Sequence, residues 1–149
     1  MTVRSDSSNH LDHRMRATSL RDFLHDCIAS TAAEEADRLR EAARLLNGAK
    51  LDHGGNEPEA VEAMLAVGAG VSAALAIIGD QAGFMLSRGG NGLCLAMFVL
   101  ADGTEDMVAE GATPALALLA AHVSALLCDL EQWGATAPAR NVATAARLH

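Results

Sequence analysis

The stretch that decides the fold is residues 83–111, "GFMLSRGGNGLCLAMFVLADGTEDMVAEG". It contains apolar runs separated by two turn signals, at 89–92 and at Asp102-Gly103, which are typical of antiparallel hairpins. The spacing predicts a three-stranded antiparallel meander, with strands at about 83–88, 92–101 and 104–110.

The middle strand is apolar on both faces. Because side chains alternate along a strand, one face carries Leu93, Leu95, Met97 and Val99, and the other carries Cys94, Ala96, Phe98 and Leu100. The helices of one chain are expected to cover one face, so the other face must meet something else. The interface candidates are Leu93, Met97, Phe98, Val99 and Leu100.

Helical patterns flank this meander. A first helix is expected over about 19–47, from a Ser19 cap to the Asn47-Gly48 stop, and a second over about 57–79, where Pro58 lies in the first turn. A third begins with Thr113 as cap and ends at Gly134. The sequence thus predicts an α+β fold with two long N-terminal helices, a three-stranded antiparallel meander and one C-terminal helix packed on the sheet.

The chain of 149 residues is the size of one domain. Residues 1–17 are polar without a helical or strand period, so we expect a mobile N-terminal extension. Residues 18–134 form the single α+β domain, and residues 135–149 form an Ala-rich C-terminal tail.

Charge restricts the classes of partner. The formal net charge is −8, and from Lys50 to Gly134 only Lys50 and Arg88 are basic, against eleven acidic residues. A groove that follows phosphates needs several Lys or Arg residues. We therefore expect no nucleic-acid binding by the acidic body.

The cysteines and the apolar segments bear on location. Cys27, Cys94 and Cys128 are widely spaced and form no C-x-x-C pair, which favours a reducing compartment. The polar N-terminus does not resemble a signal peptide. Residues 63–79 carry no charge but are rich in Ala and Gly, so a buried helix is favoured over a membrane span. A cytoplasmic protein without membrane contact is expected.

No catalytic residue, metal site or cofactor is expected. His10 and His13 flank Asp12, but they lack further ligands held by a fold. His122 lies at the edge of the apolar stripe of the third helix, where a structural histidine is more common than a catalytic base. The three thiols lie among apolar residues.

The junction between the third strand and the third helix, "AEGATPALALLAAHVSALL" at 109–127, has two interpretations. A helix N-terminus can bind an anion, but Gly111 is alone, Glu110 is adjacent and no Lys or Arg is near. Thr113 can also supply the cap itself. A structural strand-to-helix turn is therefore favoured.

The same segment resembles a known module. Residues 104–127, in which "GATPALALLAAHVSAL" follows a short predicted strand, are similar to the closing strand-turn-helix of the phage ABA sandwich domain, a small module of phage-encoded and prophage proteins that lacks an established activity. The resemblance implies a layout of sheet and helix. The long pair of preceding helices departs from that pattern, and the family adds no functional residues.

These features together predict a small non-enzymatic protein-interaction or assembly module, homo-oligomeric or bound to a protein partner, of prophage origin. The alternative is a regulatory domain in which the apolar second face of the sheet encloses a small apolar ligand. The sequence names no ligand-binding residue for that alternative.

Overall fold

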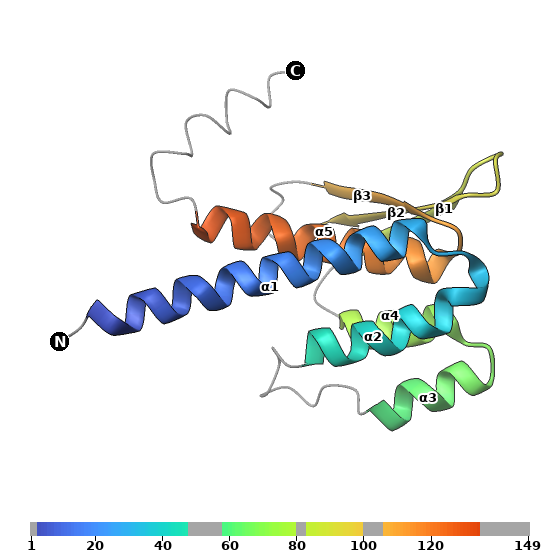
Figure 1. Ribbon diagram of the computed structural model, residues 1–149. Helices are drawn as coiled ribbons and strands as arrows, with labels where there is room; N and C mark the ends of the chain where they lie inside the picture. Colours follow the sequence, from blue (N-terminus) through green and yellow to red (C-terminus); the bar gives the residue numbers. More distant parts are fainter. Residues whose placement is uncertain (1–2, 48–57, 80–82, 100–105, 135–149) are drawn as a thin grey trace, which may run out of the picture.

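The structure is a computed structural model, which describes residues 3–47, 58–79, 83–99 and 106–134. Figure 1 shows the sheet as one outer layer, with the C-terminal helix α5 (Pro114–Gly134) and the N-terminal helix α1 (Val3–Ala29) beneath it. The remaining helices lie further from the sheet, below α5. All described helices are therefore on one side of the sheet.

The predicted meander is confirmed. The strands β1 (Gly83–Arg88), β2 (Cys94–Val99) and β3 (Asp106–Gly111) form one antiparallel sheet in the order β1-β2-β3. The turn between β1 and β2 is closed by hydrogen bonds from Gly92 N–H to Gly89 O and from Gly89 N–H to Leu93 O. Gly92 has φ +85°, so the turn has the form of a three-residue loop with a glycine bulge. The α+β class and the C-terminal helix on the sheet are shown.

Small residues allow α5 to lie close to the sheet. Ala96 of β2 and Ala109 of β3 are paired across the strands and face the helix. The facing side of α5 is rich in alanine and leucine, and every residue from Ala115 to Ala121 is buried. α5 packs on β2, β3, α1 and α4 and forms the centre of the core.

The first predicted helix is two helices. α1 ends at Ala29, the short 3-10 helix η1 covers Ala32–Glu34, and α2 covers Glu35–Asn47. Ser30 Oγ donates to the Asp26 carbonyl, and Thr31 is extended with its N–H donating to Glu34 Oε2 at 2.8 Å. This Thr-x-x-Glu arrangement is a capping box, a start signal inside the predicted helix. α2 therefore turns back beneath α1 and α5 (Figure 1).

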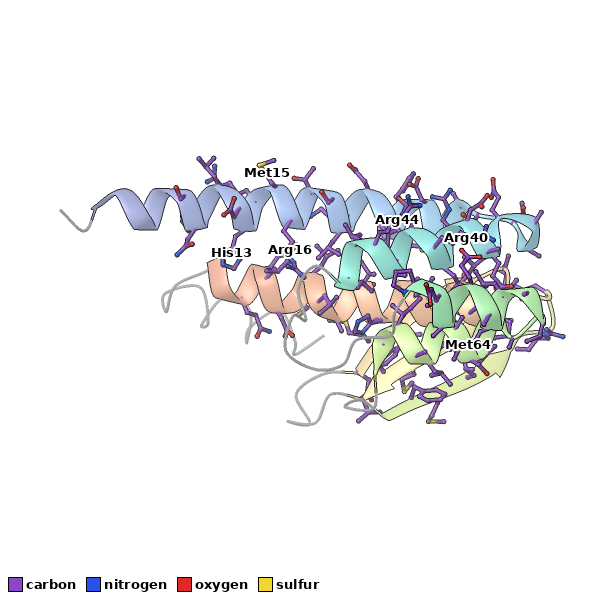
Figure 2. All side chains as sticks on the ribbon, turned by 90° about the horizontal axis from the view of Figure 1, so that it is seen from below. His13, Met15, Arg16, Arg40, Arg44 and Met64 are labelled. Atoms are coloured by element: carbon purple, nitrogen blue, oxygen red, sulfur yellow. The ribbon has the colours of Figure 1, made fainter. Side chains whose placement is uncertain are left out.

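The expectation of a mobile extension over 1–17 is corrected for residues 3–17, which form the first turns of α1. Side chains from Ser8 to Met15 are exposed, so polarity here marks a solvated helix surface rather than irregular chain. In Figure 2, His13 and Arg16 lie on the side of α1 toward α5, whereas Met15 points away. The predicted tail 135–149 lies outside the described residues.

The second predicted helix is also broken. α3 (Pro58–Ala66) and α4 (Gly70–Ile78) are joined at Gly68, which has φ +73°. Gly68 N–H donates to Leu65 O, and Ala69 N–H donates to Met64 O, the two bonds of a Schellman motif. One continuous helix was predicted over 57–79, but Gly68 interrupts it, because glycine adopts this left-handed conformation without strain.

Among the described helices, α5 is the one long and apolar enough to cross a membrane, judged by its length and composition over Pro114–Gln132. Of that stretch, 56% is buried by the rest of the chain. A buried core helix meets the same criteria, and the packing of α5 between sheet and helices is that of a core helix.

Candidate functional site

The side of the sheet that faces away from α5 is apolar. We call it the open face, and it consists of Met85, Leu95, Met97, Val99 and Val108. No helix or strand that the structure describes lies over it (Figure 1). The strand register places Met85, Met97 and Val108 in one row across all three strands. Met85 is 65% exposed and Val108 is 53% exposed, so the row is open to solvent.

Polar groups border this row toward both ends of the strands. Asp106 pairs with Val99, and Glu110 pairs with Leu95, so the two carboxylates of β3 lie on the same face beyond the apolar row. Ser87 pairs with Leu95 from the other side. An apolar centre with a polar border is typical of a surface that binds protein.

The structure separates the five interface candidates. Met97 and Val99 lie on the open face, and Leu93, just before β2, is 37% exposed. Phe98 lies on the opposite face and is 1% exposed, with its ring centroid 5.8 Å from that of His122 on α5. Phe98 is therefore a core residue and is removed from the interface. Leu100 lies outside the described residues.

At the junction between β3 and α5, Thr113 forms hydrogen bonds within the protein. Thr113 Oγ1 accepts a hydrogen bond from Leu116 N–H at 3.2 Å and donates to Glu35 Oε1 at 2.8 Å. The same carboxylate lies against Gly70 at the start of α4, since a Cβ there would be 2.9 Å from Glu35 Oε2. The Glu35 carboxylate thus lies beside the N-terminus of α5, where its negative charge disfavours the binding of an anion.

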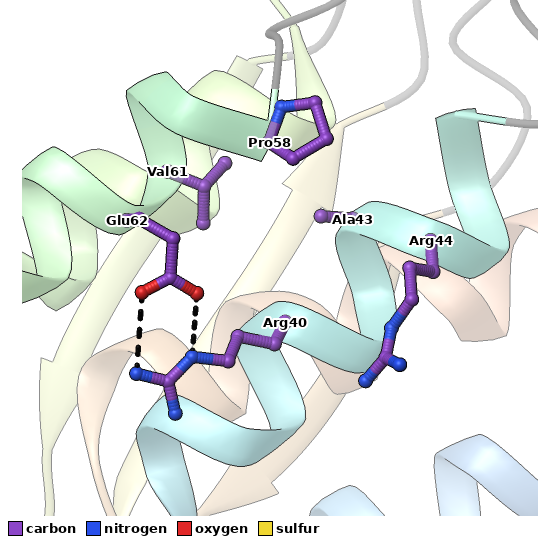
Figure 3. A pocket seen from close by; sticks show the side chains of 6 residues that line it. All are labelled: Arg40, Ala43, Arg44, Pro58, Val61 and Glu62. Atoms are coloured by element: carbon purple, nitrogen blue, oxygen red, sulfur yellow. Dashed lines mark hydrogen bonds and ion pairs between the residues drawn. The ribbon is translucent and has the colours of Figure 1, made fainter.

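A pocket of about 310 Å³ lies between α2 and α3 (Figure 3), two helices on the side of α5 away from the sheet (Figure 1). Its lining residues are Arg40, Ala43, Arg44, Pro58, Val61 and Glu62. Arg40 donates through Nε to Glu62 Oε1 at 2.6 Å and through Nη2 to Oε2 at 3.3 Å. This ion pair joins α2 to α3 at the border of the pocket.

The ion pair perturbs both partners. The hydrogen bond from Arg40 holds the pKa of the Glu62 carboxyl below its usual value, and the hydrogen bond to Glu62 raises the pKa of Arg40. Both side chains are substantially exposed, so the pair contributes little to stability. Local sequence patterns did not indicate this pocket, because Arg40 and Glu62 are 22 positions apart and carry no local signal of their pairing.

The cysteines and the described histidines are spread over several elements. No disulfide joins the three cysteines, all of which lie in the described part of the chain. His122 is half-buried, while His10 and His13 are exposed on α1. Within the described ranges no three His, Cys, Asp or Glu side chains come together to hold a metal ion.

Cys27 gives a prediction about alkaline pH. Burial raises the pKa of its thiol from 9.0 to about 12, so the folded state keeps a proton that the unfolded chain releases. The contribution of this thiol to the free energy of unfolding is fully present below pH 9 and is lost as the pH rises toward 12. At pH 10.5 the free energy of unfolding is lower by about 2 kcal/mol. Denaturant unfolding at pH 8 and 10.5 should show this loss in the wild type and not in Cys27→Val. Equal pH dependence in both would contradict the assignment.

No known protein family, curated protein or solved structure matches this chain. The resemblance of residues 104–127 to the phage ABA sandwich domain therefore stays a prediction.

Proposed function

We propose that the protein is a small, non-enzymatic assembly module that associates with other protein, including further copies of itself, through the open face of its sheet. The observation that carries this proposal is the row Met85–Met97–Val108, which spans all three strands on the side opposite every described helix. A contiguous apolar surface of this kind gains free energy when protein covers it.

The side chains of the open face suit association with protein rather than catalysis. Its central row consists of thioether and aliphatic side chains, which carry no group that donates or accepts protons at neutral pH. The carboxylates of Asp106 and Glu110 lie on one edge strand, where charge also discourages unwanted strand pairing. A cytoplasmic location and a prophage origin belong to the same proposal, supported by the widely spaced thiols and the strand-turn-helix resemblance.

Substitution of Val108 tests the proposal. Val108→Glu places a carboxylate in the apolar row, and we expect it to weaken assembly by about tenfold or more, because a buried charge without a partner costs several kcal/mol. Val67→Glu is the matched control, since Val67 is 80% exposed between α3 and α4, away from the sheet.

The measurement is size exclusion coupled to light scattering over a concentration series up to high micromolar. We expect the wild type and Val67→Glu to form a dimer or larger species and Val108→Glu to have a smaller mass. A wild type that is strictly monomeric, or a Val108→Glu variant that assembles like the control, would overturn self-assembly through the open face.

The second candidate function is small-ligand binding in the pocket between α2 and α3. Its volume of about 310 Å³ is at the lower end of the range for ligand sites. Ala43, Pro58 and Val61 give it apolar walls, and Arg44 lies one turn from Arg40 on α2 (Figure 3). A monomeric wild type in the scattering experiment would favour this function over assembly.

A further inference from the structure

Strand β1 is exposed along its whole length and on both of its faces. Phe84 and Leu86 face the helix side but are 41% and 37% exposed, and Met85 is exposed on the open face. α5 packs mainly under β2 and β3, so β1 extends beyond the helix layer. Among the described residues, β1 is thus an edge strand with partly exposed apolar side chains on both faces, a combination that favours pairing with a further strand.

Within the described sheet, β1 pairs only with β2, so some of its main-chain hydrogen-bonding groups have no strand partner there. Gly89 N–H bonds to Leu93 O, which makes that pair a hydrogen-bonded one. Hydrogen-bonded pairs alternate along an antiparallel ladder, so the register assigns the bonds with β2 to Ser87, Met85 and Gly83. The N–H and C=O groups of Phe84 and Leu86 therefore point toward the free edge.

The two edge strands, β1 and β3, differ in how well they are protected against pairing with another strand. β3 carries Asp106 and Glu110, which disfavour the approach of another acidic chain. Between Gly83 and Ser87, β1 contains no charged residue and no proline, and no acid occurs in the sequence from Gly83 to Ala101. β1 is thus the edge at which a further strand can pair.

We propose that two copies of this chain pair through their β1 edges, antiparallel and about a twofold axis at Met85, to form one continuous six-stranded sheet. This inference rests on the self-association in the proposed function, and it assigns to that association a second surface, the edge of β1. In this register Phe84 exchanges both main-chain hydrogen bonds with the partner's Leu86, and Met85 lies opposite the partner's Met85. The apolar row of the open face then continues from one copy into the other.

Self-pairing fits the charge and the geometry of this edge. Each chain has a net charge of −8, so two copies repel unless they meet where acids are absent. The edge of β1 meets that condition, and Phe84 and Leu86 lie on the same face, one on each side of the axis. A twofold interface requires such a self-complementary patch.

Disulfide trapping tests the register. In a Cys128→Ser background, Met85→Cys places two thiols on residues whose Cα atoms are about 4.5 Å apart in a non-hydrogen-bonded pair, within reach of a disulfide. Ser87→Cys is the matched control, because its two copies would lie about 13 Å apart. Under mild oxidation, we expect about tenfold more covalent dimer from Met85→Cys than from Ser87→Cys.

A second variant tests the main-chain bonds. Adding Leu86→Pro to Met85→Cys removes the outward N–H of Leu86 without removing a bond to β2, and it should abolish the cross-link while the circular dichroism stays that of the folded chain. A cross-link that persists would overturn main-chain pairing. If Leu86→Pro does not fold, the comparison of Met85→Cys with Ser87→Cys decides alone.

The outcomes separate the two proposals. An oligomeric wild type in which Met85→Cys cross-links no better than Ser87→Cys overturns β1 pairing and leaves the open face as the assembly surface. A Val108→Glu variant that remains a dimer and still cross-links through Met85→Cys supports β1 pairing. A strictly monomeric wild type without cross-links overturns both, and the β1 edge is then open to a strand of a different protein.

Discussion

Gly111→Ala is expected to destabilise the protein by about 3 kcal/mol, since it adds an atom to a site without space. Gly111 ends β3 directly under the first turn of α5, and a Cβ there would be 2.5 Å from Ala117 N and 2.9 Å from the Leu116 carbonyl carbon. Both contacts are with main-chain atoms of a helix. Relief therefore requires α5 to move away from the sheet rather than a side chain to rotate.

Gly90→Ala is the matched control for that substitution. A Cβ at Gly90 would have no atom within 4 Å, and its φ is not in the left-handed region. We expect its free energy of unfolding to stay within about 0.5 kcal/mol of the wild type in urea titrations. Equal stability of Gly111→Ala and Gly90→Ala would show that β3 and α5 are further apart than described.

Phe98→Ala is expected to cost about 3–5 kcal/mol, the usual range for emptying the site of a buried aromatic ring. The ring is 1% exposed between the sheet and α5 and contacts both Phe84 and His122. The cavity would lie against a helix that packs on most of the molecule, so the surroundings cannot easily collapse into it. Denaturant unfolding at low protein concentration measures the loss in the monomer.

Phe84→Ala is the control for Phe98→Ala. Phe84 has the same side chain, pairs with Phe98 across the strands and faces the same side of the sheet, but it is 41% exposed. We expect a loss of about 1 kcal/mol, because less apolar area leaves water on folding. A loss as large as that of Phe98→Ala would mean that β1 is covered in the monomer.

The β1–β2 hairpin and helix α5 illustrate what local sequence predicted. The turn glycines at 89–92 and the alternation along β2 specify an antiparallel pair, since both signals depend on neighbouring residues. Thr113-Pro114 and the apolar repeat after it likewise predicted α5 from its cap to its end. Which face of β2 would meet α5 was left open, because Phe98 and Met97 are equally apolar.

The helix breaks show a limit of the apolar pattern. Thr31–Glu34 and Gly68 each lie inside one of the single helices predicted over 19–47 and 57–79, and each interrupts it. The residues of the capping box and the glycine are visible in the sequence. Each favours a helix end over a continuous helix by only about 1 kcal/mol, so the local sequence alone does not decide between them. Packing of α2 and α4 beside α5 decides that competition in favour of turns.

The sequence by itself determined the α+β class, the meander, the strand-turn-helix at Thr113 and the apolar character of both faces of β2, because each is encoded in residues a few positions apart. Only the tertiary structure decided that Phe98 is in the core, that Met85, Met97 and Val108 form one exposed row, and that Arg40 meets Glu62. Those relations join residues distant in the chain, and they depend on how α5 sits against the sheet. Gly111, Ala96 and Ala109 allow α5 to approach the sheet closely and so fix its position. The periodicity of apolar residues in the sequence does not predict that position.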